Sequence, residues 1–255
     1  MTDDRERKLE TAASFDVAAE EYLHSDAHRT GADLEILTEW SHGADTVVDV
    51  ATGAGHTAGA VAEAGIETVL AVDASGEMVR TAVTEFDGVS GVVGDAERLP
   101  VATNAVDAVT CRIAAHHFPD PEAFVDEVAR VLRPGGTLAF EDNVSPDDPD
   151  LEAALNRLET LRDPTHVHSH RTGTWVEWLE DHGFVVEEVV HLKKTLEFAP
   201  WVEAQSLEDE RREQVERLLL DAPEAVASFL EVDVADGNVQ SFSNRKALIR
   251  AELPE

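Results

Sequence analysis

The chain has 255 residues and a formal charge of −33 at pH 7, from 53 acidic against 20 basic side chains. This length is enough for one α/β domain with a large core. So acidic a surface repels nucleic-acid phosphates and anionic lipids, and we expect no nucleic acid and no membrane among its partners. Only four basic residues are lysines (Lys8, Lys193, Lys194 and Lys246), which favours a salt-rich cytoplasm and a halophilic source.

Further composition signals favour a cytoplasmic protein. No apolar run approaches the roughly 18 residues of a membrane span, and the charged residues 1–10 are unlike a secretory signal. The single cysteine, Cys111, cannot form an internal disulfide and lies in an apolar run. We expect a buried, unreactive thiol in a reducing compartment.

The expected elements follow one another as helices and short apolar strands. Residues 1–45 have helical periodicity at 15–23 and 33–40 and predict an N-terminal helical lid beside a ligand cavity. Residues 46–143 form the expected cofactor-binding core, with strands at 47–50, 68–72, 91–94, within 105–113 and at 137–140, and a helix at 121–132.

Residues 144–255 are the expected substrate-side and sheet-completing part of a single domain over residues 1–255. They predict a helix at 151–161, a strand at 184–198, a helical stretch at 201–230 and a last strand at 241–251, with the two late strands antiparallel. The predicted fold is therefore α/β: a doubly wound, mostly parallel, Rossmann-like seven-stranded sheet with a late antiparallel strand.

A glycine turn follows the first strand. Gly53 and Gly55 separate that strand from a helix, and the next strand ends at Asp73. Glycine permits positive φ and lets a ligand lie against bare backbone, while a carboxylate can accept both hydroxyls of a ribose. This order predicts a nucleotide-binding half-site.

With these pieces in order, the chain resembles the class I S-adenosylmethionine-dependent methyltransferases, and is similar to small-molecule enzymes such as the quinone-biosynthesis C-methyltransferases. The resemblance covers roughly residues 45–140. Its motifs are Val-Asp-Val-Ala-Thr-Gly-Ala-Gly at 48–55, Val-Asp at 72–73, Gly-Asp-Ala-Glu-Arg-Leu-Pro at 94–100, Thr-Cys-Arg-Ile-Ala-Ala-His-His-Phe at 110–118 and Leu-Arg-Pro-Gly-Gly at 132–136.

The resemblance implies S-adenosylmethionine as cofactor. It implies that Asp49 and the backbone of residues 53–55 hold the methionine part, Asp73 the ribose, and Asp95 with the Ala96 amide the adenine edge. For Arg112 it implies a place beside the cofactor, near its carboxylate or an acidic substrate; a surface ion pair is the alternative. The full expected set is Asp49, Ala51, Gly53, Ala54, Gly55, Asp73, Ala74, Met78, Asp95, Ala96, Glu97 and Arg112.

Methyl transfer from a sulfonium mainly requires alignment and exclusion of water, so a general base is optional. The candidate bases are His116, His117 and His166, for which packing or capping is the alternative. The candidate substrate contacts are Tyr22, His28, Arg162 and Asp163. Alternating histidines at 166, 168 and 170 invite a zinc interpretation, but no further ligand is placed and we expect no metal.

We therefore expect an S-adenosylmethionine-dependent methyltransferase (EC 2.1.1.-) that acts on a small-molecule acceptor by in-line displacement. A non-catalytic S-adenosylmethionine-binding regulatory protein stays open. An NAD(P)-dependent oxidoreductase is less favoured, because Gly59 is one residue late for a dinucleotide turn and Tyr22 is the only tyrosine. The methylated atom and a homodimer through residues 200–234 also stay open.

Overall fold

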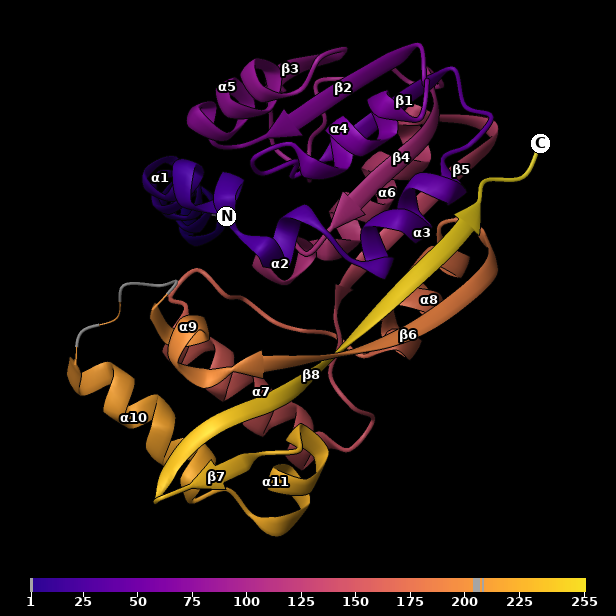
Figure 1. Ribbon diagram of the computed structural model, residues 1–255. Coiled ribbons are helices and arrows are strands. Elements are labelled where there is room, and N and C mark those ends of the chain that lie inside the picture. The colour runs from indigo at the N-terminus through magenta and orange to yellow at the C-terminus, as the bar shows by residue number, and fades with distance from the viewer. Residues whose placement is uncertain (1, 204–206, 208) are drawn as a thin grey trace.

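The structure is a computed structural model that describes residues 2–203, 207 and 209–255. One sheet crosses the whole molecule in the order β3-β2-β1-β4-β5-β8-β6, with the short β7 paired to β8 off this path (Figure 1). The strands are β1 (Thr46–Val50), β2 (Thr68–Asp73), β3 (Val89–Val93), β4 (Val106–Arg112), β5 (Leu132–Asn143), β6 (Val185–Glu197), β7 (Asp233–Ala235) and β8 (Asn238–Glu252).

The first five strands pair in parallel and form the doubly wound part of the sheet. All valines of β1, β2 and β4 are buried, as parallel strands between helices require. One face is covered by α3 (Ala32–Trp40), α4 (His56–Glu63) and α5 (Gly76–Glu85), and the other by α6 (Pro121–Val131) and α8 (Thr172–Asp181). The expected core, including the buried thiol of Cys111, is confirmed.

The two late strands pair antiparallel, as predicted. β8 lies between β5 and β6 and is antiparallel to both. We expected the fifth strand at 137–140, but β5 runs from Leu132 to Asn143. It extends this far because its end pairs with β8, where Asn143 lies opposite Lys246.

A second hydrophobic cluster lies at the far end of β6 and β8. It contains Trp201 and Phe242 and is closed by α7 (Pro149–Arg162), α9 (Phe198–Glu203), α10 (Asp209–Leu220) and α11 (Glu224–Leu230). Figure 1 shows this lower part beneath the nucleotide-binding half, with β8 running through both. Part of the predicted helical stretch, 204–206 and 208, lies outside the described residues.

The N-terminal residues form α1 (Thr2–His24) and α2 (Asp26–Arg29), and the short helix η1 (Ala115–His117) follows β4. α1 packs on α5 beside the carboxyl ends of the parallel strands (Figure 1). Within the described ranges, every helix is too short or too polar to cross a bilayer.

Candidate cofactor and acceptor site

A cavity of about 380 Å³ opens at the carboxyl ends of β1 to β4, under α1. Its wall comes mainly from α1, from the loops after these four strands and from η1, with further residues from α2, α4 and α5. Open α/β sheets bind ligands at this edge, where the strand order reverses between β1 and β4. The volume falls within the range of small-molecule sites.

The two glycines of the turn after β1 have different roles. Gly53 lines the cavity with φ +54, and an added Cβ would meet nothing within 4 Å, so bare backbone faces the ligand space. Gly55 is the N-cap of α4 with φ +97, and an added Cβ would lie 2.6 Å from Cβ of Ala82. Gly53 therefore suits close approach of a ligand, and Gly55 suits close packing of α4 on α5.

Asp73 presents its carboxylate to the cavity in a fixed orientation. Oδ2 accepts the Gly53 N–H at 2.9 Å and Oδ1 accepts the Ser75 N–H at 2.9 Å. Burial raises the pKa of Asp73. Each oxygen keeps a further lone pair, which fits the two hydroxyls of a ribose.

Asp95 and Glu97 lie on the opposite wall, and the cation that pairs with them was not predicted from the sequence. Nζ of Lys8, from α1, lies 2.7 Å from Oδ2 of Asp95 and also pairs with Glu97. Burial opposes the charge on Lys8, but the two carboxylates raise its pKa. α1 is thereby attached to the loop after β3.

The carboxylate of Asp49 lies behind the cavity wall and is 1% exposed. It accepts the Thr110 hydroxyl at 2.7 Å and the Thr52 hydroxyl at 2.6 Å. Burial raises the pKa of Asp49 to about 6. Thr52 does line the cavity, so Asp49 acts on the ligand space through the loop that it holds.

The other expected cofactor residues Ala51, Ala54, Ala74, Met78 and Ala96 line the cavity. Ala51 has φ 51, and Ile113, on the wall after β4, has φ 54. Positive φ is unfavourable for both residue types, especially the β-branched isoleucine. Such strained residues cluster at binding sites, where the surrounding structure holds them in place.

Arg112 lines the inner end of the cavity, and its ion pair is buried rather than at the surface. Nε and Nη2 lie 3.0 and 2.7 Å from Oδ2 of Asp33, and Nη1 donates to the His28 carbonyl at 2.8 Å. Glu141 and Lys246 extend this buried network, with 2.6 Å between Oε1 and Nζ. A guanidinium has five N–H groups, and among the described residues three of those of Arg112 have partners, so two remain for a carboxylate in the cavity.

The three candidate bases occupy different positions. His117 lines the cavity, whereas His116 lies behind it with Nδ1 2.6 Å from Oδ1 of Asp142. His166 is buried, with Nε2 3.0 Å from Oδ1 of Asn156. Burial and the charge on His116 lower the pKa of His166 to about 2. Asp142, the partner of His116, was not predicted from the sequence. The signal that could have indicated it is its position near the end of β5.

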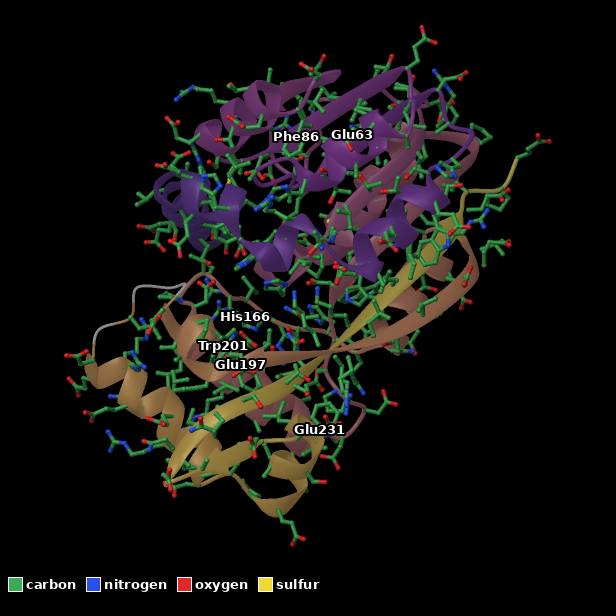
Figure 2. All side chains as sticks on the ribbon, in the orientation of Figure 1. Glu63, Phe86, His166, Glu197, Trp201 and Glu231 are labelled. Atoms are coloured by element: carbon green, nitrogen blue, oxygen red, sulfur yellow. The ribbon has the colours of Figure 1, made fainter. Side chains whose placement is uncertain are left out.

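The candidate substrate contacts also separate into two groups. Tyr22 and His28 line the cavity with their rings 4.7 Å apart. Arg162 instead stacks over Trp201, 4.7 Å from the ring centroid, and donates to its carbonyl. Figure 2 shows Trp201 in the lower part of the molecule, below His166 in this view. Asp163 is buried and not part of the cavity wall.

The residues present fit S-adenosylmethionine. A double acceptor, a bare backbone segment and spare guanidinium donors lie along one cavity, matching a ribose diol, a close-packed chain and a carboxylate. Across the described part of the chain, no three metal-binding side chains are grouped to hold an ion.

Comparisons with known proteins identify the family. A family model described as "Methyltransferase domain" matches residues 48–140. The uncharacterized methyltransferase YcgJ of Bacillus subtilis is 32% identical over 208 residues, which are 79% of this chain and 82% of that protein. The crystal structure of BH2331 from Bacillus halodurans is 34% identical with a TM-score of 0.85, and the match covers 88% of this chain and all of that one.

A more distant structure shares the fold alone. Geranyl diphosphate C-methyltransferase from Streptomyces coelicolor, solved with Mg²⁺, geranyl diphosphate and S-adenosyl-L-homocysteine, is 17% identical with a TM-score of 0.59. The match covers 87% of this chain and 78% of that one.

Proposed function

Because this chain belongs to the class I S-adenosylmethionine-dependent methyltransferases, we propose that it methylates a small-molecule acceptor inside the cavity under α1. The observation that carries this proposal is the continuity of the cavity. It runs from Asp73 and Asp95 on the cofactor side to Tyr22, His28 and His117.

The chain's own residues bind, orient and exclude water. Asp73 accepts the ribose hydroxyls, the Gly53 backbone lies along the cofactor chain, and Arg112 donates to the carboxylate. When bound, the cofactor supplies an activated methyl group. Phe15 and Tyr22 of α1 close the acceptor end with aromatic surface, 5.5 Å apart between ring centroids, which keeps water from competing with the acceptor.

The acceptor end of the cavity is lined mainly by aromatic rings. Burial and the neighbouring Arg112 charge lower the pKa of His28 to about 3, so this ring is uncharged at neutral pH. With Phe15, Tyr22 and Phe118 in the same wall, the site suits a flat apolar molecule better than a charged one.

Calorimetric titration in molar potassium chloride tests the cofactor site. We expect S-adenosylmethionine and S-adenosylhomocysteine to bind and NADH to give no heat. Asp73→Asn should weaken binding about 10- to 100-fold, because hydrogen bonds to a charged group contribute about 1.5–3 kcal/mol. Asp87→Asn, the same change on an exposed acid, is the matched control.

A methylation assay over phenols, enols, amines and carboxylates tests the activity. Turnover of any of them supports a methyltransferase with a small-molecule acceptor. Tight cofactor binding without turnover across the whole panel would favour the regulatory alternative, and binding of NADH alone would contradict the cofactor assignment.

A further inference from the structure

One wall of the acceptor end is built by η1, and the loop that follows α7 lies behind it. His117 contributes its ring to the cavity, and Thr165 and Asp163 lie behind that ring. Phe15 of α1 contacts the ring edge-on, 5.2 Å between centroids. His117 is therefore held between the N-terminal helix and the loop.

The hydrogen bonds behind His117 determine which nitrogen carries the proton. Nδ1 lies 3.0 Å from the Thr165 carbonyl oxygen and 3.1 Å from the Thr165 hydroxyl. A carbonyl oxygen only accepts, so Nδ1 must donate. The Thr165 hydroxyl donates to Oδ1 of Asp163 at 2.7 Å, so it too accepts from Nδ1.

The opposite nitrogen, Nε2, is consequently the lone-pair nitrogen of the neutral ring. It has no hydrogen-bond partner among residues 2–203, 207 and 209–255, and its ring borders the cavity. This arrangement resembles a general base oriented from behind, in which one ring nitrogen is fixed and the other faces the reacting group.

We propose that Thr165 and Asp163 are positioning residues that hold His117 with Nδ1 protonated, so that Nε2 accepts the proton of a neutral phenol or enol as it is methylated. This inference rests on the proposed function. It names the acceptor class as molecules that lose a hydroxyl proton, from the attacking oxygen or from the enol hydroxyl conjugated with the attacking carbon.

The step balances in atoms and charge. An electron pair of the acceptor, either a lone pair of the hydroxyl oxygen or the C=C π pair of an enol, forms the new bond to the methyl carbon, and the carbon–sulfur bond breaks with both electrons left on sulfur. The acceptor proton passes to Nε2 of His117. The resulting imidazolium keeps its Nδ1–H on Thr165 and faces the Asp163 carboxylate through the Thr165 hydroxyl.

Burial, together with the charge on His116, keeps His117 neutral before the reaction. Burial and the neighbouring His116, 4.2 Å away between ring centroids, lower the pKa of His117 to about 4. The other titratable groups around it are Asp163 and His166 from the loop and Asp142 from β5. A weak base suffices, because the acceptor proton becomes strongly acidic as the new bond forms.

Nitrogen-15 NMR of the histidine-labelled apo protein tests the positioning without any acceptor. The His117 signals are assigned by their loss in His117→Gln. We expect Nδ1 protonated and Nε2 unprotonated in the wild type and in Thr165→Ser. Asp163→Asn should lower the pKa of His117, because the Asp163 charge raises it. A wild-type ring protonated at Nε2 would overturn the proposal.

Methylation assays test the chemistry, with 4-nitrophenol, catechol and a 1,3-diketone as probes and benzoate as the acceptor without a removable proton. We expect His117→Gln to lower kcat at least 100-fold and Thr165→Val about 10-fold, with Thr165→Ser near wild type. His42→Gln, on an exposed histidine, is the control. Methylation of benzoate alone, or full activity in His117→Gln, contradicts the inference.

Calorimetry separates this inference from the proposed function. If S-adenosylmethionine binds His117→Gln as it binds the wild type, any lost turnover reflects His117 and not the cofactor site. If the wild type fails to bind S-adenosylmethionine, the proposed function itself is wrong.

Discussion

At the scale of single residues, burial decides what the expected site residues do. Asp49 and Asp73 end neighbouring strands, yet only Asp73 presents its oxygens to the cavity. The motif placed both acids at the correct sheet edge. It could not show that the Thr52 and Thr110 hydroxyls donate hydrogen bonds to the Asp49 carboxylate, because Thr110 is 61 positions away in the chain.

Asp49→Asn should show that the buried negative charge of Asp49 destabilises the folded protein. A carboxyl group whose pKa is raised to about 6 on folding stabilises the protein most below its unfolded pKa, and that contribution is lost as the pH rises through about 6. Asparagine preserves the hydrogen bonds, because both threonine hydroxyls can donate or accept. We expect the free energy of unfolding of the variant to rise relative to that of the wild type as the pH increases, by up to about 3 kcal/mol above pH 6.

Denaturant unfolding at a series of pH values measures this difference. Asp107→Asn is a control for which the pH dependence of stability should have the opposite sign. In the wild type, partial burial opposes the charge of Asp107, but the bond with Arg133 lowers the pKa of Asp107. Its stabilisation is present at neutral pH and lost in acid, so that variant should be the weaker one at neutral pH. An Asp49→Asn variant equally destabilised at every pH would show that the raised pKa is wrong.

At the scale of elements, the sheet follows from local patterns and the N-terminal helix does not. Apolar runs and turn glycines predicted the five parallel strands and both late strands within a few residues. The helical character of α1 was also predicted. Its attachment was not, because Lys8 meets Asp95 across 87 positions, and Asp16 reaches the Ser75 hydroxyl at 2.5 Å across 59.

Because Lys8 attaches α1 over the cavity, we expect bound nucleoside to dissociate more slowly with this attachment than without it. Lys8→Met removes the pair with Asp95 and Glu97 while keeping an unbranched side chain. Partly exposed ion pairs contribute about 0.5–1 kcal/mol, so S-adenosylhomocysteine should dissociate about 2- to 5-fold faster in stopped-flow measurements. Arg7→Met, on the exposed side of the same helix, should leave the rate unchanged; equal rates in both variants would mean that α1 does not gate the cavity.

At the scale of the whole molecule, two hydrophobic clusters share one sheet. The first cluster, in the nucleotide-binding half, could be predicted from the sequence motifs. The second depends on contacts between Trp201, Phe242 and helices that are distant in sequence. Polar groups such as Glu159 and His166 are also buried, and no local pattern indicated that burial. The strands and helices of residues 144–255 could therefore be predicted from the sequence, but the second hydrophobic cluster that they form could not.

The net charge of −33 predicts that salt stabilises the folded chain. Folding brings these acids together, and their repulsion acts over about 10 Å at 0.1 M salt but about 3 Å at 1 M. The melting temperature should therefore rise steeply with potassium chloride at low concentration and level off near 1 M. Sodium and choline chloride should act alike, because screening depends on ionic strength, whereas a rise specific to potassium would indicate bound cations. A flat melting temperature would contradict adaptation to a salt-rich cytoplasm, since repulsion would then contribute little to the stability of this fold.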